Sequence, residues 1–578
     1  MVSPQKQPRL QQWDGRTDSS RHDEPLLRQL AHKRTIIRLA IVWLTALAMT
    51  AFAAWWGVPM RYNVGEIYSH DLRARVDFVI VNHVELVNQD VQEGDIVHEK
   101  AVLSNRRVFE KYPRGMLLVP RGTPIQERQL DLLKEEHRAY GDSLAPADHW
   151  LRAGSLFILL SLIAALMAMY VARFQAGLAQ SLPMIASVCV LVLATLVLAT
   201  LLSQPPWSAL LLPMTLTAMV LTLGYNPQFA LMMSFALELA LTVTLGASVE
   251  QVLVHMGGMA TAILSLHHVR TRTQLVQVAT VAGLAYFATT IATGLLSGQT
   301  WSLMLSDGFR SFVWGSLAGF LLTGLLPLVE RCFSFVTDIS LLELADGSHP
   351  LLQELVRRAP GTYTHSITVA TLAEAGAEAV GANPLLVRVG SYFHDVGKML
   401  KPDYFIENQS GENRHDDLEP ALSTLVIIGH VKDGVALAEQ YGLPKPIVDF
   451  ILTHHGTTLV EYFYREAMRS QDANSSNPDL ESCFRYPGPK PQTREQGIVM
   501  LADAVESTSR SLTNPTPGSL RKLVHDLLMK RLLDGQFEES GLTLTELHVI
   551  EEAICKSLIA LFHSRIKYPD AEPEAKAA

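Results

Sequence analysis

Long apolar stretches recur along the chain between residues 35 and 330, and polar sequence surrounds them. The first stretch, residues 35–57, contains IIRLAIVWLTALAMTAFAAWW, and seven more lie within residues 153–330. About 20 apolar residues are enough for a helix to cross the hydrocarbon core of a bilayer. We therefore expect eight membrane-spanning helices, with the least defined boundaries near residues 204–228, where the turns are very short. The seven later spans are predicted at residues 153–172, 183–203, 207–224, 228–248, 252–268, 274–296 and 310–330.

Basic residues beside these spans predict their orientation, because Lys and Arg concentrate in short loops on the cytoplasmic side. With eight spans, the basic positions near the first, second and sixth spans share one side; they are Lys33, Arg34, Arg38, Arg173, Arg270 and Arg272. This arrangement places residues 58–150 outside the cell and the chain after about residue 331 in the cytoplasm, with Arg310 as the exception. The sequence Ala51-Phe52-Ala53 leaves a cleaved signal peptide as an alternative for the first span, although that span is long and starts late.

The polar regions predict three further parts. Residues 58–150 combine the strand-like stretches RVDFVIVNH and GMLLVP with a helix after Pro124, which indicates a small, sensor-like α/β domain outside the membrane. Residues 331–350 form a connector, and residues 351–565 are rich in helical patterns. The expected fold class is therefore mainly α: a polytopic helical bundle, a small extracytoplasmic α/β domain and a cytoplasmic all-α domain. Residues 1–34 and 566–578 are expected to be a cytoplasmic tail and a flexible tail.

Composition and charge exclude several classes of protein. Only 18% of the residues are charged and 48% are apolar, which excludes a purely soluble enzyme and a disordered chain. The net charge of −9 argues against a nucleic-acid polymer as partner, because such binding requires a basic surface. Four cysteines without a CxxC pair support neither a disulfide framework nor a zinc finger. Transport through the bundle is also not favoured, because the spans contain no ladder of acidic residues.

Histidines and aspartates between residues 365 and 503 form a pattern that a metal site requires. They come from five separate helical segments, each in or beside apolar sequence: His365, His394, Asp395, His430, His454, His455 and Asp503. Imidazoles and carboxylates together suit divalent Mn, Fe or Zn. Asp395, next to His394, could offer one oxygen to each of two ions, as in two-metal sites that support displacement at phosphorus. Taken singly, each histidine could equally be a buried core residue or a partner of a helix end.

At these residues the chain resembles the HD-domain phosphohydrolases. The strings APGTYTHS, YFHDVGK, YFIENQ, HVKDGVALA, ILTHHGT, FRYPGPKPQTREQ and VMLADAVE resemble one branch more closely. That branch is the bacterial seven-transmembrane HD phosphodiesterases that hydrolyse cyclic di-AMP, and its layout is also similar. The resemblance implies two divalent ions, with Mn or Fe favoured and Zn possible, and linear pApA as product. Thr364 stands where family members often carry another histidine, and the external domain is shorter, so no external ligand carries over.

The resemblance also implies how the ligands divide. One ion would be held by His365, His394 and Asp503, the other by His430, His454 and His455, with Asp395 as the bridge. Three further residues are candidates for contact with the substrate. Lys398 could neutralise phosphate or be a solvated surface residue, and Arg510 could touch phosphate or pair with a carboxylate. His415 lies in a polar loop, so contact with the edge of the substrate is favoured over metal binding.

The predicted function is that of a multi-pass enzyme of the bacterial inner membrane that hydrolyses cyclic di-AMP, with Asp395 and Lys398 as catalytic residues. An unidentified extracytoplasmic ligand could regulate it, membrane lipid surrounds it, and its oligomeric state stays open. One alternative is another substrate, such as cyclic di-GMP; enzymes acting on that nucleotide carry a GYP signature after the paired histidines, whereas HHGTTLVEYF follows here. The other alternative is a receptor or scaffold that binds a nucleotide without hydrolysing it.

Overall fold

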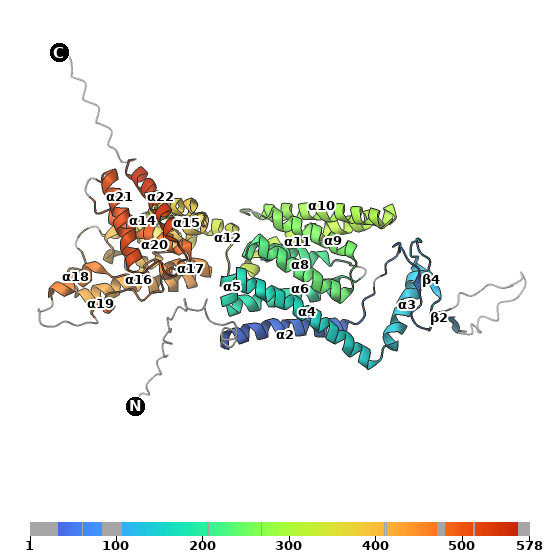
Figure 1. The fold of residues 1–578 in the computed structure, drawn as a ribbon. Helices are drawn as coiled ribbons and strands as arrows, with labels where there is room; N and C mark the ends of the chain where they lie inside the picture. The colour runs from blue at the N-terminus through green and yellow to red at the C-terminus, as the bar shows by residue number, and fades with distance from the viewer. Residues whose placement is uncertain are drawn as a thin grey trace, which may run out of the picture. The chain divides into compact units, whose positions relative to one another are not determined.

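The computed structural model describes most of the chain between residues 33 and 563. The residues in this range that it does not describe are Arg61, 84–106, 205–206, 267–268, Ser410, Glu412, 471–479 and 513–514. Both predicted tails therefore lie almost entirely outside the described residues. Contacts divide the chain into one unit of residues 1–266 and 276–322 and another of residues 267–275 and 323–578. Figure 1 shows the elements of both, and each unit is considered by itself.

Apolar helices occupy all eight stretches in which spans are predicted. Six of them are long and apolar enough to cross a membrane: α2 (Lys33–Trp56), α4 (Pro146–Phe174), α6 (Leu182–Leu202), α8 (Pro227–Leu245), α10 (Arg272–Leu296) and α11 (Trp301–Phe333). The other two, α7 (Leu211–Gly224) and α9 (Val249–Ser265), have 14 and 17 residues. At about 1.5 Å per residue, α7 is about 21 Å long, shorter than the ~30 Å hydrocarbon core. A short helix α5 (Ala176–Gln180) joins α4 to α6.

The short helix α7 is an interior helix of the bundle. It contacts α6, α8 and α9, and ten of its 14 residues are buried. Because other helices surround it, its length does not have to match the thickness of the hydrocarbon core.

Buried polar groups of the bundle pair with one another. Glu238 of α8 and His255 of α9 form an ion pair with 2.9 Å between Oε1 and Nδ1. The hydroxyls of Thr215 on α7 and Tyr286 on α10 lie 2.7 Å apart. A Cβ at Gly258 would approach the Tyr286 ring to 2.2 Å, so this glycine is needed for the close packing of α9 on α10.

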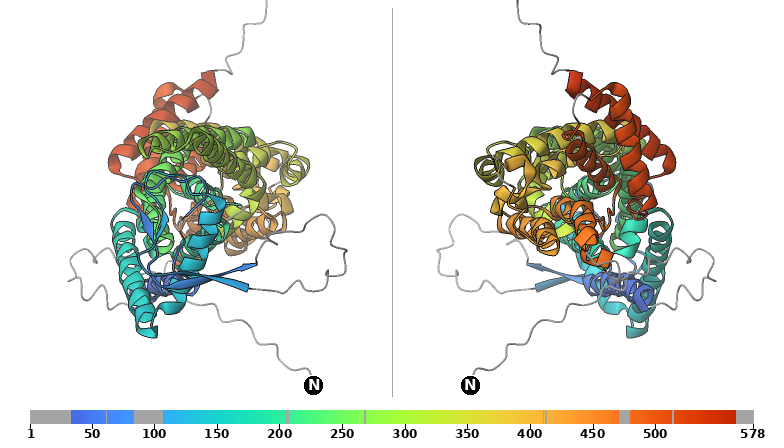
Figure 2. Two further views of the ribbon diagram at one scale, coloured as in Figure 1. Left: turned by 90° about the vertical axis from the view of Figure 1, so that its right-hand side faces the viewer. Right: turned by 90° about the vertical axis from the view of Figure 1, so that its left-hand side faces the viewer.

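A small α/β region lies between α2 and α4 in the sequence. Strand β1 (Leu72–Arg73) pairs antiparallel with β4 (Leu117–Val119), and β2 (Phe78–His83) pairs antiparallel with β3 (Arg107–Tyr112). Figure 2 shows the β2–β3 pair as a two-stranded ribbon. Helix α3 (Glu127–Ser143) follows and buries Glu136, whose carboxylate binds Arg75. Strands β2 and β4 and helix α3 lie in the predicted stretches, whereas β1 and β3 lie outside them. The location of this region outside the membrane stays a prediction.

The second unit is helical and contains two adjacent cores. One core joins α14 (Pro360–Ala379), α20 (Arg494–Ser509), α21 (Pro517–Leu533) and α22 (Leu544–His563). The other joins α12 (Asp338–Leu344), α13 (Pro350–Arg358), α15 (Pro384–Phe393) and α17 (Lys445–Thr453). Helices α21 and α22 pack side by side, as Figures 1 and 2 show. Several helices begin with proline at the first position, where the missing N–H costs no hydrogen bond.

The remaining elements of the second unit are short, except for α16 (Pro420–Gln440). They are the 3₁₀ turns η2 (Val396–Leu400), η3 (Pro402–Tyr404) and η4 (Ile406–Asn408), and the helices α18 (Glu461–Ser470) and α19 (Leu480–Cys483). By length and composition α16 also resembles a membrane span. It is not one, because it packs against η2, α17 and α18 and buries Ser423, Thr424 and His430.

Candidate metal centre

Seven polar side chains converge in the second unit, and they are the seven predicted ligands. His365 lies within α14, His430 within α16 and Asp503 within α20, whereas His394 and His454 cap the C-termini of α15 and α17. Two groups of potential ligand atoms each lie within 4.8 Å of one another. We call His365, His394 and Asp503 the acidic half, and His430, His454 and His455 the histidine half. Asp395, which follows His394 directly, belongs to both groups.

The acidic half combines two imidazoles with carboxylate oxygens. The Nε2 atom of His365 lies 3.1 Å from Oδ1 of Asp503 and 3.3 Å from Oδ2 of Asp395. The Nε2 atom of His394 lies 3.2 Å from the same Oδ2 of Asp395 and 3.8 Å from Oδ1 of Asp503. All four side chains are buried. These atoms surround one point, as ligands of a single ion would.

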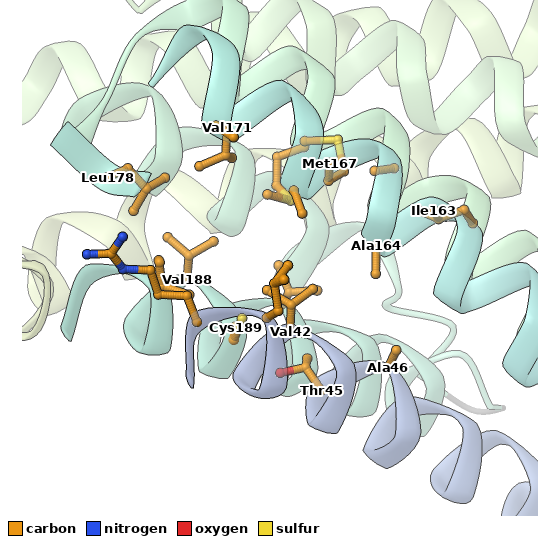
Figure 3. A pocket seen from close by; sticks show the side chains of 18 of the residues that line it. Val42, Thr45, Ala46, Ile163, Ala164, Met167, Val171, Leu178, Val188 and Cys189 are labelled. Carbon is orange, nitrogen blue, oxygen red and sulfur yellow. The ribbon is translucent and has the colours of Figure 1, made fainter. Parts of the chain in front are cut away.

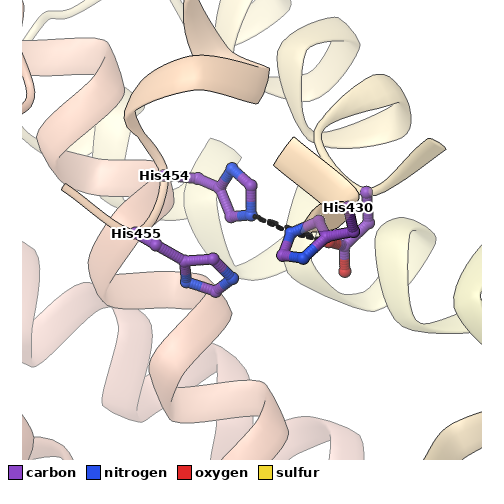
Figure 4. A group of neighbouring side chains, drawn as sticks. His430, His454 and His455 are labelled. Atoms are coloured by element: carbon purple, nitrogen blue, oxygen red, sulfur yellow. Dashed lines mark hydrogen bonds and ion pairs between the residues drawn. The ribbon is translucent and has the colours of Figure 1, made fainter. Parts of the chain in front are cut away.

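The histidine half faces the other oxygen of Asp395. His430 Nε2 and His454 Nε2 lie 3.3 Å and 3.6 Å from Oδ1 of Asp395. The same two nitrogens lie 3.2 Å from each other, and Figure 4 shows the rings pointing together with His455 beside them. His455 is the most exposed of the seven, with 19% of its side chain accessible. Asp395 therefore presents one oxygen to each half, which is the arrangement of a bridging ligand.

Hydrogen bonds fix which nitrogen of each imidazole is available. The Nδ1 atoms of His394, His430 and His454 lie 2.7, 2.6 and 2.9 Å from the backbone carbonyls of Ser391, Ile427 and Ile451. A carbonyl can only accept, so each Nδ1 carries the proton and, in the neutral ring, Nε2 carries a lone pair. Two lone pairs facing each other repel unless a cation lies between them. The histidine half is therefore prepared to hold a positive ion.

Unpaired buried atoms support the same conclusion for the acidic half. The Nε2 atoms of His365 and His394 and both oxygens of Asp395 have no partner with hydrogen-bond geometry among the described residues, although Lys398 forms an ion pair with Oδ2 of Asp395. Buried polar atoms are nearly always paired in proteins, so these atoms call for a ligand. The donors, nitrogen and carboxylate oxygen, are those that Mn, Fe and Zn accept. The residues present thus fit divalent metal binding.

A close approach between two backbones brings Asp395 to His430. A Cβ at Gly397, in η2, would lie 1.9 Å from the carbonyl oxygen of His430 and 2.5 Å from the nitrogen of Gly434. Only glycine permits η2 to lie this close to α16. The position of Asp395 beside the histidine half therefore depends on a residue that donates no ligand.

Electrostatics differ between the halves. In the acidic half, burial alone would lower the pKa of His394, but the carboxylates of Asp395 and Asp503 outweigh it and raise the pKa to about 9. The pKa of His365 is also raised, because three carboxylates offset its burial. In the histidine half, burial lowers the pKa of His430 to about 3, and burial together with His454 lowers that of His455.

The two predicted cations of the site are both paired with carboxylates. Lys398 Nζ lies 2.7 Å from Oδ2 of Asp395 and 3.0 Å from Oε1 of Glu407. Although burial would lower the pKa of Lys398, these carboxylates raise it, so the side chain stays charged. Arg510 donates to Oε1 of Glu506 rather than to a ligand atom. This pairing was one of the two possibilities for Arg510 that the sequence left open.

His415 lies apart from the two ligand groups. Its Nε2 atom is 2.8 Å from the backbone carbonyl of Tyr404, and its ring packs against Tyr404 and Phe463. The Nδ1 atom of His415 is buried without a hydrogen-bond partner among the described residues. Its predicted contact with substrate stays a prediction.

Two carboxylates of the centre are absent from the sequence predictions. Glu506 binds Nδ1 of His365 on the side away from Asp503, so it orients a ligand without being one. Glu407 binds Lys398. Glu506 follows Asp503 by three residues, which places both on one face of a helix, and this spacing was the available signal. Glu407 lies in a 3₁₀ turn, where no periodicity indicates it.

Comparison with known proteins identifies the class to which this site belongs. Residues 362–508 match the HD domain, and residues 150–337 match the family described as "7TM receptor with intracellular HD hydrolase". Together the two matches cover more than half of the chain. The second unit thus contains an HD domain, a class of metal-dependent domain, and the described centre lies within the matched residues. The chain belongs to the family of multi-pass membrane proteins that carry this domain behind a seven-helix region.

Curated relatives cover part of the chain. A cyclic-di-AMP phosphodiesterase, PgpH of Bacillus subtilis, is 44% identical over 297 residues, which are 51% of this chain and 40% of the relative. PgpH of Listeria monocytogenes is 37% identical over 370 residues, which are 63% and 50% of the two chains. The chain thus spans about half the length of the curated relatives it matches. A solved L. monocytogenes PgpH HD domain in complex with cyclic-di-AMP is 44% identical, with a TM-score of 0.36, and covers 37% of this chain and 99% of that one.

Proposed function

We propose that this chain is a membrane-bound phosphodiesterase that hydrolyses cyclic di-AMP to linear pApA. The observation that carries the proposal is the convergence of seven ligands in two groups that share Asp395. The relatives named cyclic-di-AMP phosphodiesterase support the choice of substrate, because their matched regions are 37–44% identical to this chain. The Lys and Arg pattern beside the spans supports an HD domain on the cytoplasmic side of the inner membrane and an α/β region on the outer side. In that location the α/β region could bind an unidentified external ligand.

The centre would hold two divalent ions, Mn or Fe in preference to Zn. The acidic half would hold one ion and the histidine half the other, with one oxygen of Asp395 directed to each. Bound ions of this kind supply Lewis acidity and lower the pKa of a bound water.

Charge balance supports a substrate with two negative charges. With every imidazole neutral, as metal binding requires, four carboxylates in or directly behind the centre exceed the two cations, Lys398 and Arg510, by two charges. These carboxylates are Asp395, Glu407, Asp503 and Glu506. Two divalent ions would reverse this balance and leave two positive charges. A cyclic dinucleotide carries one negative charge on each of its two phosphodiesters. The filled centre would thus be electrostatically matched to the substrate.

The protein's residues would position the reaction rather than transfer protons. In hydrolysis, the oxygen of one water forms a bond to phosphorus, the bond from phosphorus to the ribose 3′-oxygen breaks, and that oxygen takes up the proton of the water. Asp395 fixes the distance between the halves, and Lys398 balances the charge of Asp395 from the side of Glu407. Lys398 reaches phosphate only if this pairing loosens when the ions bind.

The proposal is tested with the purified full-length protein, loaded anaerobically with Mn, and the variant Asp395→Asn. We expect the wild type to convert cyclic di-AMP to pApA faster than it converts cyclic di-GMP, and the variant to show background turnover. A matched control is Asp403→Asn, since Asp403 is an exposed carboxylate that pairs with Arg414 outside both ligand groups. Full turnover by Asp395→Asn would refute the site. Faster turnover of cyclic di-GMP than of cyclic di-AMP would favour another substrate. Nucleotide binding by a protein that holds no metal would favour a receptor.

A further inference from the structure

A large apolar cavity lies among the helices of the first unit, far along the sequence from the metal ligands. Its volume is about 780 Å³, and its walls come from α2, α4, α5, α6 and α8. Figure 3 shows Val42 and Ala46 of α2 on one side and Ile163, Ala164 and Met167 of α4 on the other. Ligand pockets commonly have volumes of about 300–1,000 Å³, so the space is large enough for a substantial ligand.

Small side chains create the space. Ala164, Ala168 and Ala172 recur every four residues along α4 and so share one face, and Ala236 and Ala240 do the same on α8. Small residues in membrane helices usually let the backbones approach until no space remains. Here they line a partly open cavity of about 780 Å³, whereas the cavities that stay empty in proteins are enclosed and measure about 150 Å³. Apolar matter therefore has to fill it.

Charge is confined to one end of the cavity. Among the described lining residues, Arg38 is the only charged one, and none is acidic. Its Nη2 atom donates to the backbone carbonyl of Gln180 in α5, so the guanidinium is fixed at the end formed by α2 and α5. Thr45, further along α2, uses its hydroxyl within its own helix by donating to the carbonyl of Ile41. Beyond this end the lining is apolar apart from the Thr45 hydroxyl and the Cys189 thiol.

The length of the cavity matches a lipid chain. Its lining on α2 runs from Thr35 to Met49, which corresponds to about 21 Å of helix at ~1.5 Å per residue. One leaflet of the hydrocarbon core is about 15 Å deep, half of the ~30 Å total. From Arg38 to Met49 the lining covers about 16 Å of helix, so an acyl chain that starts at the level of Arg38 can lie along this part of the cavity.

We propose that this cavity is a binding site for one acyl chain of an anionic membrane phospholipid, whose phosphate lies against Arg38. The bilayer supplies both the chain and the negative headgroup. The orientation predicted from the basic residues puts Arg38 on the cytoplasmic side, where anionic lipids meet the positive residues of membrane proteins. A zwitterionic lipid could insert the same chain but would bring a compensating positive charge to Arg38.

The test is native mass spectrometry of the full-length protein, delipidated in neutral detergent and then given equimolar phosphatidylglycerol and phosphatidylcholine with identical chains. We expect one retained phosphatidylglycerol per protein and a preference of about fivefold over phosphatidylcholine. A fivefold preference corresponds to the binding free energy of about 1 kcal/mol that one basic residue contributes at an anionic membrane surface. In Arg38→Gln the preference disappears while a lipid of either kind is still retained. In Ala164→Trp, which fills the cavity, neither lipid is retained.

Matched controls separate the site from general effects. Arg173→Gln removes an exposed charge from α4 that does not line the cavity, and Leu166→Trp adds a ring to an exposed position of the same helix. Both should keep the wild-type preference, and Ala164→Trp should keep the wild-type unfolding temperature if it is folded. Equal retention of both lipids by the wild type would overturn the proposal. An undiminished preference of Arg38→Gln for phosphatidylglycerol would also overturn it. This second result does not depend on whether Ala164→Trp folds.

Discussion

The two halves of the metal centre share Asp395 but differ in charge. The acidic half places its two histidines against the carboxylates of Asp395 and Asp503, with Glu506 behind one of them. The histidine half has three imidazoles: His430 and His454 lie 3.3 and 3.6 Å from one oxygen of Asp395, and His455 lies 3.7 Å from Oδ2 of Asp503. Carboxylates attract a dication strongly, whereas neutral imidazoles offer directed lone pairs with less charge.

The difference indicates how the centre is filled. The acidic half should hold its ion more firmly and should accept Mn readily, since oxygen ligands suit that metal. The histidine half should bind more weakly and should depend on the ion already present to position Asp395. We expect sequential filling, with the acidic half first, and the following experiments test that order from the largest effect to the smallest.

The largest expected effect comes from disabling one half at a time. We expect His430→Ala to retain about one ion per chain, because the acidic half keeps all its ligands, and Asp503→Asn to retain less than one. Both variants should lose hydrolysis, since each removes a ligand of the shared centre. Metal content after anaerobic purification, measured by inductively coupled plasma mass spectrometry, distinguishes them. His525→Ala alters an exposed histidine elsewhere in the domain and serves as the control. Equal metal loss in both variants would show that the halves do not differ.

A smaller effect is expected from Glu506→Gln. The carboxylate holds Nδ1 of His365 and makes the imidazole a stronger ligand, and loss of such an outer partner typically weakens metal binding by about 10–100-fold. The weakening should be confined to the first ion bound, as measured by competition with a chelator. Glu551→Gln removes a similar carboxylate–histidine pair at His525, outside the centre, and should leave both affinities unchanged. Loss of the second ion alone would contradict the assignment of Glu506 to the acidic half.

The smallest effect is the response of the metal-free protein to pH. The pKa of His394 is raised from 6.5 to about 9, so its contribution to stability is complete below 6.5 and is lost as pH rises through 9. The pKa of His430 is lowered from 6.5 to about 3, so its contribution is present above 6.5 and is lost as pH falls toward 3. Thermal unfolding of chelated protein should show His394→Ala most destabilised in acid. His430→Ala should instead gain relative to the wild type as pH falls. If the stability changes of His394→Ala and His430→Ala followed pH in the same direction, the two halves would not differ in their electrostatics.

The sequence indicated which seven side chains converge better than it indicated the groups around them. Their types and their order along the chain are visible in the printed residues, and the structure brings all seven together. The partner of Lys398 was not predictable, because it depends on how η4 lies beside η2 in space. Arg510 differs, because it pairs with Glu506 four residues earlier in the same helix. The division of the seven ligands between two ions still rests on the resemblance and on the proposal.

Hydropathy alone also misleads in both directions. Helix α16 is apolar enough to be taken for a span, yet it is packed inside the HD domain and carries His430. Helix α7 is too short for a span, yet it lies within the bundle because neighbouring helices cover it. Apolar composition reports that a helix is buried, and it does not report whether lipid or protein buries it.

The contact at Gly397 has a consequence for judging related sequences. A methyl group at this position would collide with the backbone of His430, so α16 and η2 would separate and the bridge across the centre would open. All seven donors could then be present in a chain whose two halves no longer meet. Counting conserved donors is therefore not enough to separate working enzymes from inactive descendants. The spacing that lets two backbones touch has to be counted with them.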